Sequence, residues 1–185
     1  INASSVYPYD IIKSIKHGGE KVVAQAQWES LPNYMEGIDE KVLPVVDVSG
    51  SMETPAGNNG NVTCMDVSTS LGMYISERNE GVFKNAFITF SMRPQLQLLK
   101  GSLATRLNQL ERADWGMNTD LKATFELILD QAVKHNVPPL EMPTKVLILS
   151  DMEFDEAIGS RMYDVSDWNP TAQEMIKGMY EEAGY

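Results

Sequence analysis

The chain has only one cysteine, Cys64, and two histidines, His17 and His135, among its 185 residues. A single cysteine excludes an internal disulfide framework and a zinc site built on paired cysteines. Neither histidine lies near a serine or cysteine pattern, which argues against a hydrolase that uses histidine as its base. No run of 18 apolar residues is present, so the sequence predicts no transmembrane helix. We therefore expect a cytoplasmic protein without a membrane partner.

Basic residues are also few: Lys and Arg number 15 against 26 Asp and Glu, which gives a net charge of −11. A chain this acidic repels phosphate backbones, so a surface that binds nucleic acid would be a local exception. The acidic charge instead favours binding of cations or basic partners. Apolar residues make up 43% of the chain, which is enough for one globular domain with a packed core.

The first 38 residues read as two short helices. Asp10 is expected to cap the first, and Gly18 and Gly19 end it. The second begins near Glu20, with Val22, Val23, Ala26 and Trp28 on its apolar side. A polar connector extends to Glu40, and the composition then changes abruptly to a β-branched apolar run that begins at Val42.

The remaining residues alternate between apolar runs and helical patterns. The expected strands cover residues 42–46, 83–90, 95–99 and 145–149, and the expected helices cover 65–76, 102–111, 120–134 and 171–183. Thr119 is positioned to cap the third of these helices. This alternation predicts an α/β fold with a mostly parallel sheet flanked by helices.

Oxygen-bearing side chains follow the expected strands. Asp47, Ser49 and Ser51 come directly after the first strand, Thr119 precedes a helix, and Asp151 follows the fourth strand. In an open α/β sheet, ligands bind outside the carboxyl ends of the strands, so these loops are expected to converge. Alternate residues of an extended turn point the same way, which lets the first three side chains reach one ion. Hard oxygen donors with few charges suit Mg²⁺, with Mn²⁺ as a similar candidate.

This set of residues resembles the metal-ion-dependent adhesion site of von Willebrand factor A domains. The order Asp47-x-Ser49-x-Ser51, Thr119 before Asp120, and Asp151 after an apolar strand carries the resemblance from about Val42 to the end. Within that superfamily the chain is most similar to the intracellular branch, including the A domain of Ro/TROVE-type ribonucleoproteins. The resemblance implies a Rossmann-like sheet in the order 3-2-1-4-5-6, with the third strand antiparallel.

The resemblance also implies a role for each site residue. Ser49, Ser51 and Thr119 would bind Mg²⁺ directly, with Mn²⁺ or Ca²⁺ as alternatives, while Asp47 and Asp151 would hold it largely through water. The sixth position would accept an acidic side chain from a protein partner. Two departures from the family pattern stand beside the ligands: Met117-Asn118 precedes Thr119, and Met152 follows Asp151. Neither departure removes a ligand.

The same resemblance implies a domain organisation. Residues 1–38 would be the tail of a preceding α-helical domain, and residues 39–185 the A-like domain. Only four strands are evident, and 34 residues follow Asp151, so we expect the C-terminal strands to be missing after the fourth strand and its helix. The start at Ile1 rather than Met fits a piece of a longer protein.

Three functions compete for these residues. The leading interpretation is a non-enzymatic, cation-dependent protein-interaction module inside a ribonucleoprotein or other intracellular assembly. The second is a Mg²⁺-dependent phosphoester hydrolase. Phosphatases that use a strand-end Asp as nucleophile have a second Asp two residues later, and Ser49 at that position argues against this function. The third is RNA binding, in which we expect the contacts to come from missing upstream sequence and not from this acidic domain. The structural alternative is that the same serines only form turns and cap helices.

Overall fold

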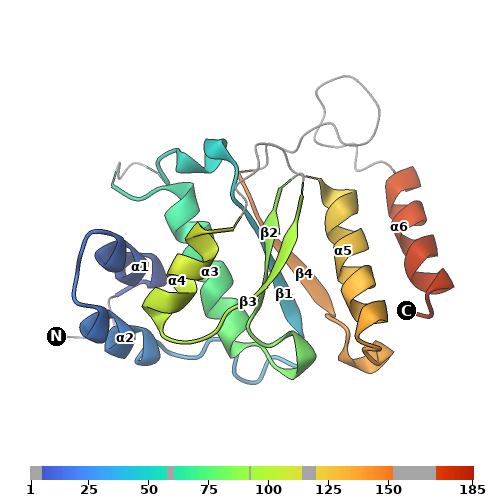
Figure 1. The fold of residues 1–185 in the computed structure, drawn as a ribbon, viewed down its shortest axis with the longest axis horizontal. Helices are drawn as coiled ribbons and strands as arrows, with labels where there is room; N and C mark the ends of the chain where they lie inside the picture. The colour runs from blue at the N-terminus through green and yellow to red at the C-terminus, as the bar shows by residue number, and fades with distance from the viewer. Residues whose placement is uncertain (1–5, 58–60, 92, 114–119, 152–169) are drawn as a thin grey trace.

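The computed structural model describes residues 6–57, 61–91, 93–113, 120–151 and 170–185. In these residues four strands form one sheet in the order β3-β2-β1-β4 (Figure 1). The strands are β1 (Val42–Asp47), β2 (Ala86–Phe90), β3 (Gln95–Leu98) and β4 (Lys145–Leu149). Strand β1 pairs in parallel with β2 and β4, whereas β2 and β3 are antiparallel.

The expected α/β fold is confirmed, with one refinement. The sheet is mixed rather than mostly parallel, because the connection from Phe90 to Gln95 is much shorter than the roughly dozen residues that a parallel crossover needs. The observed order coincides with the first four strands of the order that the resemblance implies.

Helices cover both faces of the sheet (Figure 1). The α-helices are α1 (Pro8–Lys16), α2 (Lys21–Glu29), α3 (Cys64–Arg78), α4 (Leu103–Glu111), α5 (Leu121–Lys134) and α6 (Pro170–Glu182). Short 3-10 turns are η2 (Gly50–Glu53), η3 (Gly81–Phe83) and η4 (Pro139–Glu141). Among the described residues, none of the helices is both long and apolar enough to cross a membrane.

One core lies between the sheet and helices α1 to α4. Ile11, Ile12 and Trp28 of the N-terminal helices are buried there together with Val46 and Phe87 of the sheet. The first two helices therefore share a core with the α/β sheet.

The apolar side of α2 differs from the prediction. Ala24 and Trp28 are buried, but Val22 is 82% exposed and Val23 is 46% exposed. The buried side of α2 is set by its contacts with α1 and α4, which the local pattern does not encode.

Helix α3 lies directly on the sheet. A side chain at Gly72 would come within 2.5 Å of the Val46 Cγ2 atom and 2.7 Å of Phe87 Cε2, so only glycine allows this close approach. The hydroxyls of Ser70 and Ser76, both buried, donate to the carbonyls of Val67 and Met73 in the same helix. These bonds satisfy polar groups that the packing would otherwise leave without a partner.

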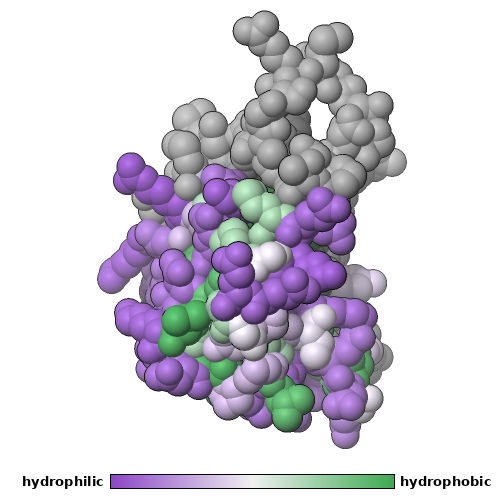
Figure 2. Space-filling model, turned by 90° about the vertical axis from the view of Figure 1, so that its right-hand side faces the viewer, coloured by the Kyte–Doolittle hydropathy of each residue, from purple (hydrophilic) through white to green (hydrophobic). Residues whose placement is uncertain are grey.

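The second core covers the opposite face, where Ile128 of α5 meets Leu43, Val45, Ile88 and Phe90. Helix α6 packs on α5 from outside: the Tyr180 hydroxyl donates to the Phe125 carbonyl at 2.9 Å, and Tyr185 donates to that of Val137 at 2.7 Å. Burial raises the pKa of the Tyr180 hydroxyl. The face of the molecule on the α6 side is mainly hydrophilic, with small hydrophobic groups between the polar side chains (Figure 2).

Two caps differ from the predictions. Tyr7, not Asp10, precedes the first turn of α1, and its backbone N–H donates to the Asp10 carboxylate at 3.2 Å. Asp120 caps α5, since its Oδ1 accepts from the Ala123 N–H at 2.9 Å. A carboxylate at this position also benefits from the positive end of the helix dipole. Thr119, the expected cap, lies outside the described residues.

Candidate metal site

The strand register brings three chain segments to one edge of the sheet. Asp47 pairs with Phe90 of β2, and Val46 pairs with Leu149 of β4. Ser91 and Ser150 therefore follow directly beside Asp47, because neighbouring parallel strands end at the same edge. The Asp120 N–H donates to the Ser91 carbonyl at 3.4 Å, which places the start of α5 at this edge as well.

Asp47 is the most buried polar group of this edge, with no exposed surface. Its Oδ1 accepts from the Ser49 N–H at 2.8 Å, and its Oδ2 accepts from the Ser150 hydroxyl at 2.6 Å. Among the described residues, no Lys, Arg or His side chain forms an ion pair with it. Two hydrogen bonds reduce the cost of burying a carboxylate, but they supply no compensating positive charge.

The two serine hydroxyls of the motif lie side by side. The Oγ atoms of Ser49 and Ser51 are 2.9 Å apart and form a hydrogen bond. Adjacent ligands of an octahedral Mg²⁺ at about 2.1 Å from the ion are roughly 3.0 Å from each other. The spacing of the pair is thus compatible with two neighbouring Mg²⁺ ligands, as is that of any hydrogen-bonded pair of hydroxyls.

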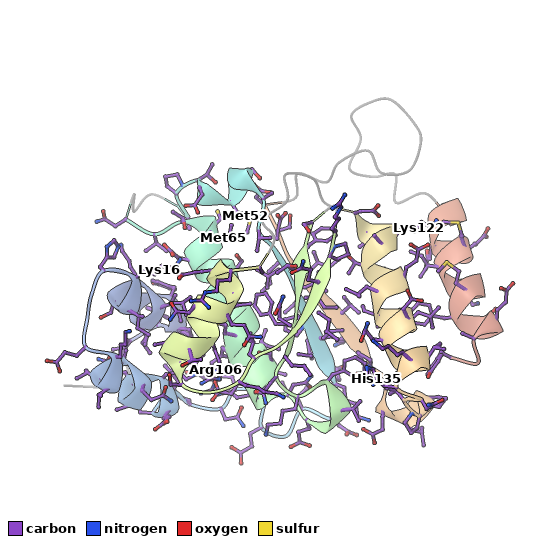
Figure 3. All side chains as sticks on the ribbon, in the orientation of Figure 1. Lys16, Met52, Met65, Arg106, Lys122 and His135 are labelled. Carbon is purple, nitrogen blue, oxygen red and sulfur yellow. The ribbon has the colours of Figure 1, made fainter. Side chains whose placement is uncertain are left out.

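The turn that carries these hydroxyls is held by a backbone hydrogen bond and by apolar packing. Ser49 precedes η2, and its carbonyl accepts from the Met52 N–H at 3.2 Å. Met52 is buried with Val48 and Met65 in a small apolar cluster between η2 and the start of α3, where Figure 3 labels both methionines. Packing of this kind limits the rearrangement that ion binding would demand of the serines.

The nearby basic residues of α1 are engaged elsewhere. Lys16 forms an ion pair with Asp66 at 2.9 Å, and the Lys13 ammonium donates to the Asn61 carbonyl. Asp66 also accepts from the Thr63 N–H at 3.3 Å as part of the α3 cap. Burial alone would raise the pKa of Asp66, but the hydrogen bonds from Lys16 and Thr63 and the charge of Lys16 bring that pKa below its ordinary value. The positive charge of Lys16 thus pairs with the beginning of α3, not with Asp47.

A family model described as "Domain of unknown function (DUF7788)" matches residues 41–185, which include every residue of the candidate site. The chain belongs to the DUF7788 family. The matched region contains the whole sheet and helices α3 to α6, while α1 and α2 precede it.

This DUF7788 chain is also similar to "Uncharacterized protein L728" of Acanthamoeba polyphaga mimivirus. The two are 26% identical over 189 residues, an alignment that covers 100% of this chain and 30% of the viral protein. The chain thus spans less than a third of the length of that curated relative, and the alignment includes α1 and α2. No solved structure matches the chain.

The structure of this DUF7788 domain brings some of the predicted ligands together. Asp47, Ser49 and Ser51 are joined by hydrogen bonds, and Asp151 follows directly on Ser150, which contacts Asp47. Thr119 lies outside the described residues. In the part of the chain that the structure describes, no three His, Cys, Asp or Glu side chains form a metal-binding group. A site of the proposed kind contains only two carboxylates, and hydroxyls supply its other side-chain ligands.

Ser150 is the residue of this DUF7788 edge whose contact was not predicted from the sequence. Its hydroxyl reaches Asp47 because β4 pairs with β1 in parallel and both strands end together. The available signal was the position of Ser150 at the end of an apolar strand, which acquires meaning only once the two strands are known to be neighbours.

Proposed function

We propose that this domain is a divalent-cation-dependent protein-interaction module. The observation that carries the proposal is Asp47, a fully buried carboxylate with hydrogen-bond donors at both oxygens and no cationic side chain paired with it in the described residues. Buried charges in proteins are paired or bind metal ions. A cation beside Asp47 would supply the missing charge.

The donors fit Mg²⁺ or Mn²⁺ better than zinc. Ser49 and Ser51 offer neutral hydroxyl ligands at a suitable spacing, and Thr119 would add a third. Asp47 and Asp151 would hold the ion largely through water. Because the direct protein ligands are neutral, the ion keeps most of its charge and attracts an anionic ligand in its open position. We infer that this ligand is an acidic side chain of a protein partner, with Mn²⁺ and Ca²⁺ as alternative ions.

Binding, not hydrolysis, is the proposed activity. Ser49 occupies the place where a strand-end Asp phosphatase would have its second acid, so the motif has no evident general acid for a leaving group. We further propose, on the resemblance to intracellular A domains, a cytoplasmic ribonucleoprotein or other assembly in which RNA would be bound by a region upstream of this chain.

The first test is titration calorimetry with Mg²⁺, Mn²⁺ and Ca²⁺. We expect one site with a dissociation constant of roughly millimolar to micromolar order, since water supplies much of the shell. The double variant Asp47→Ala, Asp151→Ala is expected to bind none of the three ions. Unchanged binding by this double variant would contradict the site.

The second test concerns the partner. Intact protein and a Thr119→Ala form are used to capture partners from source lysate, each with Mg²⁺ and with chelator. A protein recovered only by the intact form in Mg²⁺ supports the proposal. A partner retained equally in chelator and by Thr119→Ala would show that another surface binds it. Generic phosphate esters, assayed with and without Mg²⁺, test the hydrolase alternative.

A further inference from the structure

The Asp47 carboxylate is held at both oxygens by groups from two different segments. One donor is the Ser49 N–H of its own turn, at 2.8 Å from Oδ1. The other is the Ser150 hydroxyl at the end of β4, at 2.6 Å from Oδ2. Hydrogen bonds from a hydroxyl to a carboxylate are strong and about 2.5 to 2.7 Å long, and the Ser150 bond lies within that range.

Two donors on opposite oxygens fix the plane of a carboxylate. With only the Ser49 bond, the group could rotate about its terminal side-chain torsion, which is broad for Asp. The Ser150 bond opposes this rotation and leaves each oxygen with remaining acceptor capacity, since an ionised carboxylate has about four lone-pair sites.

We propose that Ser150 is a positioning residue of the cation site, which sets the orientation of Asp47 toward the ion and its waters. This inference rests on the proposed function, since it assigns Ser150 a part in the same site. It goes beyond the five-residue pattern, which contains no residue at this position.

A purely structural role for the Ser150 hydroxyl is the competing explanation. Strands β1 and β4 are already joined by backbone pairing from Val42–Lys145 to Val46–Leu149, so one further side-chain bond adds little to the sheet. Its largest expected effect is therefore on ion affinity. Residues that orient metal ligands from outside the coordination shell typically change metal affinity by about 10- to 100-fold when they are substituted.

The test is Mn²⁺ and Mg²⁺ calorimetry on Ser150→Ala, Ser150→Thr and the intact chain, with a thermal melt of each metal-free protein. We expect Ser150→Ala to raise the Kd for the ion by about 10- to 100-fold. Ser150→Thr keeps the hydroxyl and is expected to recover most of the affinity. The matched control is Ser76→Ala, which removes a buried hydroxyl bonded 3.0 Å from the Met73 carbonyl inside α3 and is expected to leave the Kd unchanged.

The outcomes separate this inference from the proposed function. If the intact chain binds neither ion, both fall together. If the intact chain binds and Ser150→Ala binds equally well, only the role of Ser150 is overturned. Should Ser150→Ala fail to fold, Ser150→Cys takes its place, because a thiol of similar size is a much weaker donor. An unchanged Kd in that variant likewise overturns the inference.

Discussion

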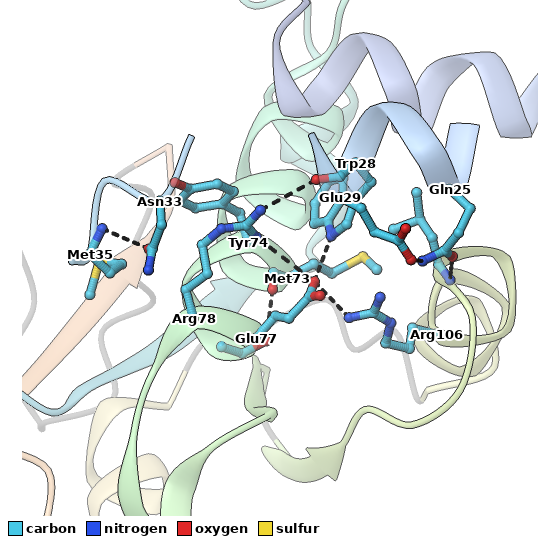
Figure 4. Close-up of polar contacts among 12 residues, drawn as sticks. Gln25, Trp28, Glu29, Asn33, Met35, Met73, Tyr74, Glu77, Arg78 and Arg106 are labelled. Atoms are coloured by element: carbon cyan, nitrogen blue, oxygen red, sulfur yellow. Dashed lines mark hydrogen bonds and ion pairs between the residues drawn. The ribbon is translucent and has the colours of Figure 1, made fainter. Parts of the chain in front are cut away.

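Two carboxylates of this molecule are surrounded in opposite ways. Within the described residues, Asp47 at the edge of the sheet accepts hydrogen bonds from a hydroxyl and a backbone N–H and forms no ion pair. Glu77, on α3, forms an ion pair with the Arg106 guanidinium at 2.7 Å and accepts a hydrogen bond from the Trp28 indole N–H at 2.5 Å (Figure 4). The Arg78 guanidinium lies 3.9 Å from the same oxygen.

The cationic side chains around Glu77 are themselves held in place. Arg78 lies over the Tyr74 ring at 4.0 Å from its centroid and donates to the Trp28 carbonyl at 3.3 Å. Arg106 is almost fully buried between α2 and α3. A carboxylate that the chain neutralises with its own arginines joins helices α2, α3 and α4. Asp47 has no such partner among the described residues, and it is there that we propose a cation from outside the chain.

The largest expected effect is on the helical side. Glu77→Ala removes the acceptor shared by Arg106 and Trp28 and leaves a buried guanidinium without its counter-charge. Because the Glu77 side chain is 29% exposed, we expect a loss of about 3 kcal/mol in unfolding free energy, the lower end of the range for broken buried pairs. Urea denaturation measures this loss.

The matched control for Glu77→Ala is Glu29→Ala, on the neighbouring helix α2. Glu29 is exposed and, within the described part of the chain, accepts a single hydrogen bond, from the Gln25 amide at 2.7 Å. Its removal is expected to cost at most about 0.5 kcal/mol. Equal losses in the two variants would contradict a special role for the Glu77 network.

Asp47→Asn is expected to act in the opposite direction in metal-free protein. It removes a buried charge without a cation while keeping nearly the same shape, so unfolding free energy should stay constant or rise by about 1 kcal/mol. The same variant should lose ion binding in calorimetry. A loss of several kcal/mol in metal-free protein would mean that the charge of Asp47 is compensated within the chain, and the comparison with Glu77 would fail.

Ion binding should stabilise the intact protein by less than Glu77→Ala destabilises it. At a Mg²⁺ concentration ten times the dissociation constant, the gain in unfolding free energy is about 1.4 kcal/mol. A melt with and without chelator measures it, and Glu77→Ala should show the same increment on its lower baseline, since that network is separate from the sheet edge. An increment that persists in Asp47→Asn would place the ion elsewhere.

Asp66 lies between these two cases, since it pairs with one lysine, and the change in stability expected from breaking this pair is the smallest. Its pKa is lowered in the folded protein, so its ion pair with Lys16 stabilises the fold at neutral pH and is lost as pH falls below the ordinary value of 3.8. Lys16→Ala should therefore destabilise the protein at pH 7, and the difference from the intact chain should shrink in acid. A difference that is constant with pH would show that Lys16 acts through packing alone.

Much of the fold follows from local patterns. The run from Val42 to Val46 is buried at every position and forms the central strand, as its uninterrupted apolar, β-branched character predicts. Leu103, Leu107 and Leu110 recur at helical spacing and are all buried on one side of α4. Such features depend on neighbours within a few residues, and the sequence contains that information directly.

The positions of the candidate ligands at strand ends are local in the same sense. Asp47 and Asp151 each follow an apolar run, and the sequence shows this without any knowledge of pairing. The tertiary structure decided that β1 lies between β2 and β4, and this placement allows Ser150 to donate to Asp47. It also decided the exposure of Val22, which the local pattern placed on the same side as Trp28, because the side of a short helix that becomes buried depends on which helices pack against it. The charge balance of Asp47 and Glu77 has the same origin: sequence supplies the acids, and only long-range packing determines which of them meets an arginine.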